Sequence, residues 1–316
     1  MKTQLGDARI CLFIGTRRGL TVLESLVKAN YQVAAVLVLA QQSHEIDNCT
    51  GSIIAFCKKH KIPNKTSLEI TSSGYYEFLL FHKPTIVFAI SWRFLIPDTC
   101  FEVPSRGIFI IHDSLLPRYR GASPTNWVII NGEKETGLSL QYISRDVDAG
   151  DLVDQIKVSI DPEDDAKTLN DKLTILYPKI ILKNITAIIN KKNKRLPQNH
   201  ELATFACRRS PEDGKISFTE PTHKTINLIK GLTYPYPGSF CYYSNEKVII
   251  WQATQLTKIP KYEGHIPGKI ISVTSEYVDV LTNDGILRIL KIGLPSEPNV
   301  FLKPNSVLKS ISQTLR

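Results

Sequence analysis

The stretch "ICLFIGTRRGLTVLESLVKANYQVAAVLVLA", residues 10–40, decides the fold class of this chain. Residues 10–15 and 33–40 are short apolar runs rich in β-branched side chains, and residues 19–30 between them carry an apolar face at helical spacing. Continuous apolar runs are typical of strands that are buried on both faces of a parallel sheet. Residues 10–40 therefore predict a strand, a crossover helix and a second, parallel strand.

The same alternation continues toward the C-terminus. We expect helices over residues 52–62 and 73–83, strands over residues 84–90, 136–143 and 152–160, and one long helix over residues 164–189. This order predicts an α/β fold with a doubly wound (Rossmann-like), mostly parallel sheet, whose ligands bind at the carboxyl ends of the strands.

The pattern changes after Cys207. Short strand-like runs are separated by turn signals such as "PYPG", "SNEK" and "NDG", which is typical of a small β-barrel. We therefore expect two domains, a catalytic domain over residues 1–195 and a smaller C-terminal OB-like β-barrel over residues 206–316, with a linker over residues 196–205.

Composition narrows the function classes. The 316 residues include 42% hydrophobic residues, six scattered cysteines and no apolar run of membrane-spanning length. Asp7 and Arg9 interrupt the N-terminus before a secretory apolar core, so we expect a soluble, cytoplasmic protein with reduced thiols. The formal charge of +9 indicates an anionic partner, which nucleic acid, a nucleotide or an anionic membrane surface would satisfy.

Two basic segments have ordinary interpretations. "GTRRGL", residues 15–20, follows the first strand but lacks the full glycine fingerprint of a dinucleotide site. It is a tight turn or an anion site made by Arg17, Arg18 and the helix N-terminus. The run "KKNKR", residues 191–195, is typical of a solvated helix end.

One histidine, His112, follows a predicted strand at its carboxyl end, where open α/β sheets bind their ligands. His112 ends the apolar run "IFII", and Arg118 and Arg120 follow in a proline-containing loop, so an anion-attracting rim surrounds the imidazole. A lone histidine can also be a satisfied core residue. The acidic segment "DVDAGD", residues 146–151, is either a solvated turn or the source of a carboxylate that orients His112 for acid–base work.

The stretch "HDSLLPRYRGASPTNWVIINGEKETGLSLQYISRDVDAGDLVDQ", residues 112–155, resembles the signature of the folate-dependent formyltransferases. The resemblance extends to "SWRFLIP" at residues 91–97, "CRRSPEDGKISF" at residues 207–218 and "YPYPGSF" at residues 234–240. It implies that an amine attacks the formyl carbon of the co-substrate 10-formyltetrahydrofolate and that the oxyanion of the tetrahedral intermediate must be stabilised.

The family's catalytic constellation is an asparagine, a histidine two residues later, and an aspartate. The histidine corresponds to His112 and the aspartate to Asp148, whereas the asparagine position holds Ile110. Residues 110 and 112 of a strand point to the same face, so the isoleucine offers the oxyanion no donor there. The His112 imidazolium, a backbone N–H of the loop or Asn126 are the candidate substitutes.

The resemblance also implies two groups of binding residues and no metal. Those expected to contact the folate, largely through backbone groups, are Trp92, Arg93, Leu115, Ile143, Ser144 and Arg145, although Trp92 can equally belong to the core. Those expected to contact the acceptor and its phosphates are Ser114, Arg118, Arg120 and Asn126, together with the helix that opens at Ser123.

Two branches of the family compete for the acceptor. The methionyl-tRNA enzymes carry a basic insertion after the second strand, but residues 40–52, "AQQSHEIDNCTGS", contain no Lys or Arg. "SWRFLIP" and "PTNWVIINGE" resemble the sugar-nucleotide branch instead. We therefore expect a dTDP- or UDP-linked amino sugar of surface polysaccharide synthesis, such as lipopolysaccharide O-antigen, as the acceptor, and a homodimer as a further option.

Three other functions remain open, and Ile110 is the reason for the second of them. Methionyl-tRNA formylation is the first, and a catalytically silent relative that binds folate or a nucleotide sugar is the second. A hydrolase that releases formate from the co-substrate is the third.

Overall fold

The structure is a computed structural model, described here for residues 8–40, 48–68, 70–257 and 260–316. The chain divides into two compact units. The first holds residues up to 121 together with 136–158 and 171–206, and the second holds residues 122–135, 159–170 and 207–316. The contiguous domains expected from the sequence thus differ from these units, because residues 122–135 and 159–170 pack with the C-terminal part of the chain.

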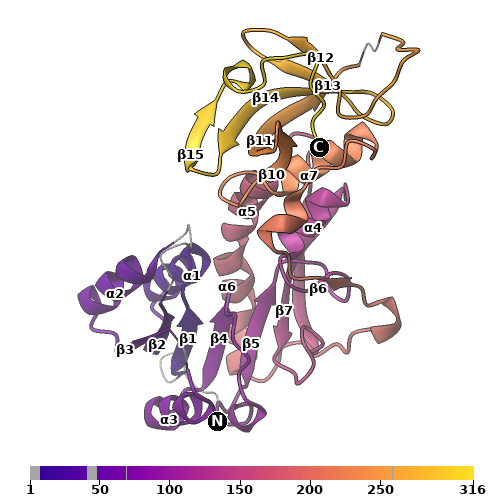
Figure 1. The fold of residues 1–316 in the computed structure, drawn as a ribbon. Coiled ribbons are helices and arrows are strands. Elements are labelled where there is room, and N and C mark those ends of the chain that lie inside the picture. The colour runs from indigo at the N-terminus through magenta and orange to yellow at the C-terminus, as the bar shows by residue number, and fades with distance from the viewer. Residues whose placement is uncertain (1–7, 41–47, 69, 258–259) are drawn as a thin grey trace. The chain divides into compact units, whose positions relative to one another are not determined.

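The first unit is built on a seven-stranded sheet in the order β3-β2-β1-β4-β5-β7-β8 (Figure 1). Strands β1 to β5 are parallel, and β7 joins β5 in the antiparallel direction. The strands are β1 Ile10–Ile14, β2 Val33–Leu39, β3 Asn64–Ser67, β4 Ile86–Ile90, β5 Ile108–His112, β7 Glu135–Tyr142 and β8 Leu152–Ser159. The predicted Rossmann-like sheet is confirmed.

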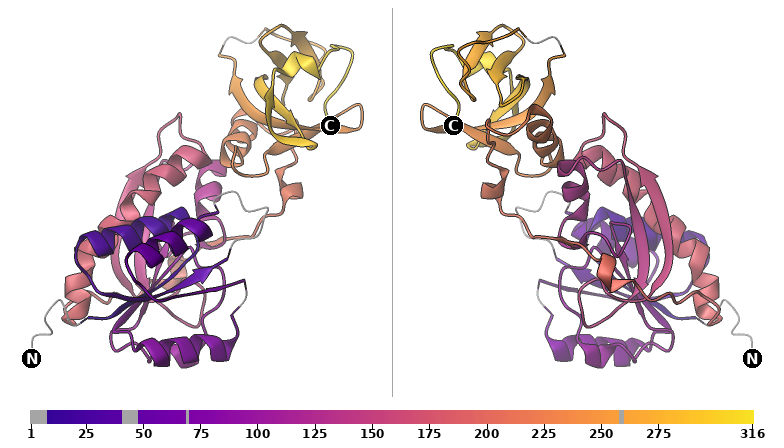
Figure 2. Two further views of the ribbon diagram at one scale, coloured as in Figure 1. Left: turned by 90° about the vertical axis from the view of Figure 1, so that its left-hand side faces the viewer. Right: turned by 90° about the vertical axis from the view of Figure 1, so that its right-hand side faces the viewer.

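Helices cover both faces of this sheet. Helix α1 packs against α6 on one face and α3 lies on the other (Figure 2). The helices are α1 Arg17–Lys28, α2 Thr50–Lys59, α3 Ser72–His82, α5 Ala166–Thr174 and α6 Leu176–Ile189. The single helix predicted over residues 164–189 is wrong in one respect, since the chain forms two helices with Ile175 between them.

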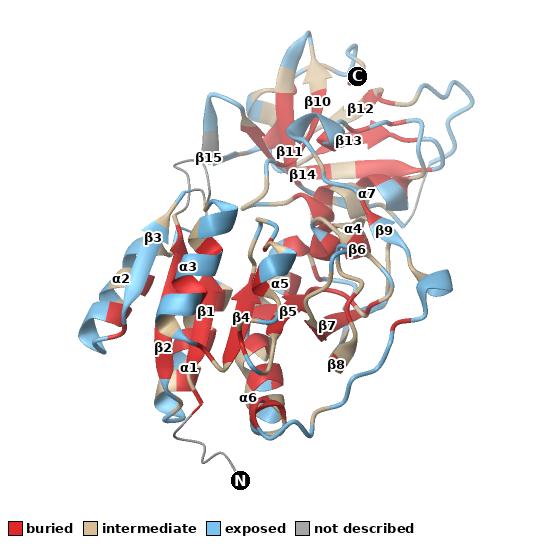
Figure 3. Ribbon diagram, turned by 90° about the horizontal axis from the view of Figure 1, so that it is seen from below, coloured by how far each residue is buried: buried red, intermediate tan, exposed pale blue. Residues whose placement is uncertain are grey.

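The central strands are apolar throughout because both of their faces are covered (Figure 3). Every residue of β1, β2 and β4 is buried. The parallel strands β1 to β5 all end at the same edge of the sheet, and His112 lies there as the last residue of β5. The predicted linker adds a short ladder of β6 Arg120–Gly121 with β9 Phe205–Ala206.

The second unit is a six-stranded antiparallel sheet with two helices, α4 Pro124–Ile130 and α7 Thr222–Gly231. Its strands are β10 Ser239–Tyr243, β11 Glu246–Gln255, β12 Ile270–Val273, β13 Val278–Leu281, β14 Ile286–Leu294 and β15 Glu297–Leu302. Residues 314–316 bridge the two edges of the sheet, because Arg316 exchanges backbone hydrogen bonds with Tyr242 and the Leu315 N–H donates to the Gly268 carbonyl oxygen. The sheet therefore curls toward the predicted barrel.

Three expectations from composition concern the chain as a whole. The six cysteines all lie in the described ranges, and none of them forms a disulfide bond. Among the helices described, none is long and apolar enough to cross a membrane. The segment 41–47, which carries most of the argument against a tRNA acceptor, lies outside the described residues.

Candidate active site

His112 is the last residue of β5, and its ring is held on both sides. Only 7% of the residue is exposed, and Nε2 lies 2.7 Å from the carbonyl oxygen of Tyr119. A carbonyl oxygen only accepts, so Nε2 carries a proton in this arrangement. The loop after β5 therefore fixes the tautomer and leaves Nδ1 to face the neighbouring residues.

Asp148 reaches that second ring nitrogen. Its Oδ2 lies 3.4 Å from His112 Nδ1 and accepts a hydrogen bond from the backbone N–H of Gly121 at 2.9 Å. Asp148 adopts φ +54°, and Gly150 packs so closely on β7 that a Cβ there would lie 1.8 Å from the Tyr142 carbonyl oxygen. The Asp-Ala-Gly turn thus brings the carboxylate to the imidazole, as an acid–base pair requires.

A network of buried polar side chains supports Asp148 from behind. Arg120 donates to Gln198 Oε1 at 2.7 Å, and Gln198 Nε2 donates to the carbonyl oxygens of Asp148 and Gly150 at 2.9 and 2.7 Å. Gln198 Nε2 also lies 3.3 Å from Gln141 Oε1, while Gln141 Nε2 donates to Asp148 Oδ1 at 3.2 Å. These contacts fix both ends of the turn that carries the carboxylate.

A second carboxylate, Asp113, lies next to His112 in sequence and has different partners. Arg18 Nη1 donates to its Oδ2 at 2.5 Å, and the buried hydroxyl of Tyr177 donates to its Oδ1. Burial raises the pKa of the Tyr177 phenol, so this group stays a neutral donor. Arg18 also lies 5.1 Å from the centre of the Tyr177 ring.

Both Arg17 and Arg18 have acidic partners. Arg18 is bound to Asp113, and Arg17 lies 3.5 Å from Asp171 on the surface. This geometry therefore favours ion pairs within the chain over an anion site formed by the two arginines. Their role in this structure is to tie α1 to the end of β5 and to the helices behind the sheet.

The residues expected to contact folate lie in different surroundings. Trp92 donates from Nε1 to the Tyr75 hydroxyl at 2.9 Å and packs on the apolar cluster beneath the sheet, so its indole belongs to the core. Arg93 is exposed, and Leu115 is partly buried beside Gly137. The backbone N–H of Ile143 donates to Ile108, Ser144 bonds Asp146, and Arg145 pairs with Asp98 at the surface.

The residues expected to contact the acceptor differ in exposure to solvent. Arg118 is exposed on the loop after β5, where it can meet a ligand. Ser114 is buried, and its hydroxyl donates to the Arg118 carbonyl at 2.6 Å. The Arg120 guanidinium is also buried and donates to Gln198 at 2.7 Å. Both differ from the expectation of phosphate contact, because their donors already have internal acceptors.

Asn126 and Ser123 belong to the second unit. Asn126 is buried, and its Nδ2 donates to the Gly231 carbonyl at 2.7 Å, so it ties α4 to α7. Ser123 adopts φ +53° and makes no side-chain capping hydrogen bond. The structure thus gives Asn126 a packing role, which differs from the expectation that it contacts the acceptor or replaces the family's asparagine.

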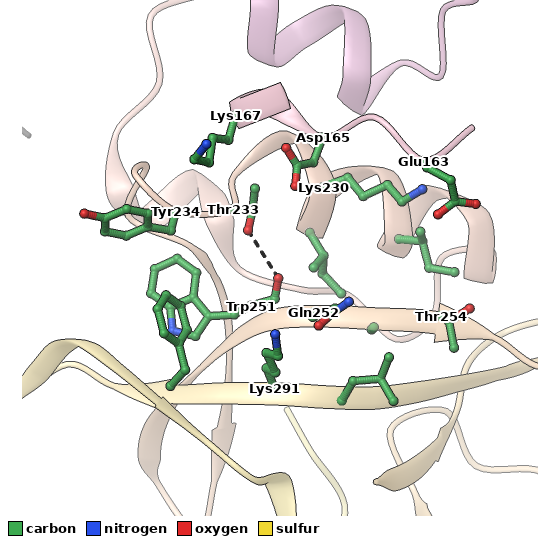
Figure 4. A pocket seen from close by; sticks show the side chains of 15 residues that line it. Glu163, Asp165, Lys167, Lys230, Thr233, Tyr234, Trp251, Gln252, Thr254 and Lys291 are labelled. Carbon is green, nitrogen blue, oxygen red and sulfur yellow. Dashed lines mark hydrogen bonds between the residues drawn. The ribbon is translucent and has the colours of Figure 1, made fainter. Parts of the chain in front are cut away.

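The second unit also contains a cavity of about 660 Å³ (Figure 4). It lies between α7 and strands β11 and β14, and its wall combines aromatic and charged side chains. Tyr234 and Trp251 both pack against Phe301 at its edge, with ring centres 6.0 and 5.7 Å apart. The predicted site residues are absent from this lining among the described residues, so the cavity does not mark the His112 site.

Sequence reasoning missed Gln141 and Gln198. Gln141 had a detectable signal, since a polar residue on the buried strand "GLSLQY" must find a partner. Gln198 had none, because it lies in a segment that reads as a linker. Only the three-dimensional structure shows that this segment returns to the carboxyl end of the sheet.

Family models match both parts of the chain. A model described as formyl transferase matches residues 11–185, and one described as formyl transferase, C-terminal domain, matches residues 208–303. The chain is 31% identical over 264 residues to the bifunctional polymyxin resistance protein ArnA of Wigglesworthia glossinidia brevipalpis. That alignment covers 84% of this chain but only 40% of the relative, so the chain spans about two fifths of that protein.

Solved structures share the fold at low identity. WlaRD, a sugar 3N-formyl transferase solved with dTDP and 5-N-formyl-THF, has a TM-score of 0.66 at 22% identity and covers 90% of this chain and 97% of its own. The N-formyltransferase of Helicobacter canadensis, solved with folinic acid and dTDP-3-aminofucose, has a TM-score of 0.69 at 22% identity. It covers 90% of this chain and 98% of its own.

Proposed function

This chain belongs to the formyl transferase family, and we propose on that premise that it transfers the formyl group of 10-formyltetrahydrofolate to the amine of a nucleotide-linked amino sugar. The observation that carries the proposal is the pairing of His112 Nδ1 with Asp148 Oδ2 at the carboxyl end of β5. Two residues distant in sequence meet there, inside the region that matches the family.

The pair supplies the proton movements that formyl transfer needs. The amine nitrogen bonds to the formyl carbon, the bond from that carbon to the folate nitrogen breaks, and one proton passes from the amine to the folate nitrogen. Asp148 accepts the amine proton, and His112 Nδ1 takes it from the carboxylate and relays it onward. Nε2 stays bound to Tyr119, so the imidazolium stabilises the negative oxygen through its charge and not through a direct hydrogen bond. Tyr119 and Gly121 hold these two groups in place during the exchange.

The choice of acceptor rests on two supports. Both structural relatives named above were solved with a folate and with dTDP or a dTDP-linked amino sugar. In this chain Arg118 provides an exposed cation on the loop after β5 for an anionic acceptor. We propose a dTDP- or UDP-linked amino sugar for surface polysaccharide synthesis, and dimerisation is a separate hypothesis.

The test uses the purified full-length chain with 10-formyltetrahydrofolate and a panel of dTDP- and UDP-linked amino sugars. We expect tetrahydrofolate release that depends on one acceptor, with mass spectrometry showing a formyl group on its nitrogen. Formate release without acceptor would identify a hydrolase, and formylation of methionyl-tRNA alone would identify the tRNA branch. No product with any acceptor would overturn the proposal.

A further inference from the structure

The strand register places a carboxamide beside the position that lacks one. In the β5–β7 ladder Ile110 is directly opposite Gln141, and His112 is opposite Ser139. Directly opposed residues project from the same face of a sheet, with Cβ atoms about 4.5–5.5 Å apart. Gln141, only 1% exposed, therefore rises next to Ile110 on the face that carries His112.

The hydrogen-bond network determines which end of this carboxamide faces the site. A guanidinium has only donors, so Gln198 presents its oxygen to Arg120 and its nitrogen to the other side. The Asp148 carboxylate only accepts, so Gln141 presents Nε2 to Asp148 and Oε1 to the Gln198 nitrogen. Arg120 and Asp148 thus set the two ends of this row of amides.

The Gln141 amide has donor capacity that the network does not use. Nε2 carries two hydrogens, and one is donated to Asp148 Oδ1 at 3.2 Å. Within the residues that the structure describes, no acceptor meets the second hydrogen. Of the other candidates, His112 Nε2 is bound to Tyr119, the Gly121 N–H to Asp148 and the Asn126 amide to Gly231.

We infer that Gln141 donates the hydrogen bond to the formyl oxygen that the isoleucine at position 110 cannot provide. The inference rests on the proposed function and identifies a further residue for it. When the amine bonds to the formyl carbon, the C=O electron pair moves to the oxygen, and the Gln141 N–H beside Asp148 meets that charge. When the bond to the folate nitrogen breaks, the pair returns and the proton leaves as described above.

Gln198 and Arg120 serve this donor as positioning residues. They lie behind Gln141, away from its Nε2, and touch no reacting group themselves. Their contribution is to prevent the amide from rotating, because the reversed amide would place an oxygen against the Asp148 carboxylate. A neutral amide held this way gives a preorganised donor at little cost during the reaction.

The experiment compares Gln141→Leu and the longer Gln141→Met with the parent chain, using the acceptor found for the parent. We expect kcat to fall about 100- to 1000-fold in both variants with KM nearly constant, which is the effect of removing one oxyanion donor. Adding Ile110→Asn should restore kcat at least tenfold in the Gln141→Leu background and change the parent little. Gln252→Leu, an exposed glutamine in β11, is the matched control.

The outcomes separate this inference from the function on which it rests. An active parent whose Gln141 variants keep kcat within threefold overturns the inference and leaves formyl transfer intact. Variants that lose activity without any rescue by Ile110→Asn also overturn it, since a structural role explains that result. A parent that is inactive with every acceptor overturns the function and the inference together.

Discussion

Two carboxylates, Asp113 and Asp148, lie at the end of β5, and their surroundings differ in one decisive way. Asp113 is paired with the permanently charged Arg18 at 2.5 Å and with the neutral hydroxyl of Tyr177. Asp148 has no arginine or lysine on it within the described chain and is held by the N–H groups of Gly121 and Gln141, with His112 at 3.4 Å.

The difference shows how one strand end separates structure from chemistry. A guanidinium does not release its proton near neutral pH, so the Arg18–Asp113 pair is electrostatically fixed. An imidazole nitrogen can both accept and donate a proton, so the pair of His112 and Asp148 can exchange one during a reaction. β5 ends at His112 and Asp113 is the first residue after it, so the chain leaves the strand between the two residues and gives them different partners.

Removing the Asp148 carboxylate should have the largest effect, and that effect should be on catalytic activity. Asp148→Asn keeps the size of the side chain but removes the proton acceptor, and it should lower kcat about 1000-fold, or about 4 kcal/mol in the barrier. Stability in urea should fall by about 1 kcal/mol, because the amide oxygen can still accept from Gly121 whereas the Gln141 donor loses its acceptor. Steady-state kinetics and urea titrations measure the two effects, and a variant with near-parental kcat would contradict the assignment.

Breaking the Arg18–Asp113 pair should instead lower the stability of the fold. Arg18→Met leaves the buried Asp113 carboxylate without its cation and should lower the free energy of unfolding by about 3 kcal/mol. The double variant Arg18→Met with Asp113→Leu should lose less, since no charge then stays buried without a counter-ion. Urea unfolding followed by circular dichroism gives both values. Equal losses in the single and double variants would mean that the pair contributes packing only.

The fold was largely predictable from the sequence because the apolar runs are long and regular. Residues 10–40 carry the period of two strands and a helix, and burial of all residues of β1 and β2 follows from it. The break at Ile175 was not predictable in the same way, since the helical spacing continues across it. Neither were the unit boundaries, because packing of residues 122–135 and 159–170 with the C-terminal part depends on tertiary contacts.

Only the two central residues of the candidate site, His112 and Asp148, were predictable from the sequence. The histidine and aspartate were found through family resemblance, and the structure brings them within 3.4 Å of each other, while their catalytic roles stay a prediction. Arg120 was expected to bind phosphate because it follows Arg118 in a loop that leads to a helix N-terminus. Its burial depends on Gln198 returning from the linker region, a contact that no local pattern encodes.

A smaller effect should follow from loosening Asp148 while leaving its carboxylate. Gln198→Leu removes the donor to the carbonyl oxygens of Asp148 and Gly150, so the turn and the Gln141 amide lose their common support. We expect kcat to fall about tenfold, since modest misplacement of reacting groups is sufficient for that loss. Kinetics with the acceptor identified for the parent measure it. Gln155→Leu, which removes donors to Leu116 and Ser139, is the matched control, and equal losses in both would show general loosening.

The smallest effect concerns Asp284, a surface carboxylate that is held mainly by hydrogen-bond donors. Its Oδ1 accepts from the backbone N–H and the hydroxyl of Thr222, both at 2.8 Å, at the start of α7. The backbone N–H of Thr222 is the main cause of a lowered pKa of Asp284, and the charge of His223 makes a smaller contribution. This carboxylate therefore shows mainly what hydrogen-bond donors contribute at a surface site.

Asp284→Ala should lower the free energy of unfolding by about 0.5–1 kcal/mol at pH 7, near the low end for a helix cap because solvent screens the site. Since folding lowers this pKa, the stabilisation is complete above the unfolded value of about 3.9 and is lost as the pH falls through the folded value. The difference between parent and variant should therefore shrink when urea titrations are repeated at pH 3, where other carboxylates titrate equally in both chains. A difference between parent and variant that stays constant with pH would show that the Asp284 side chain stabilises the fold through its packing and not through its charge. Hydrogen-bond donors would then contribute little to stabilising a charged carboxylate in this chain. The difference between Asp148 and Asp113 would depend on their charged or ionisable partners, His112 and Arg18.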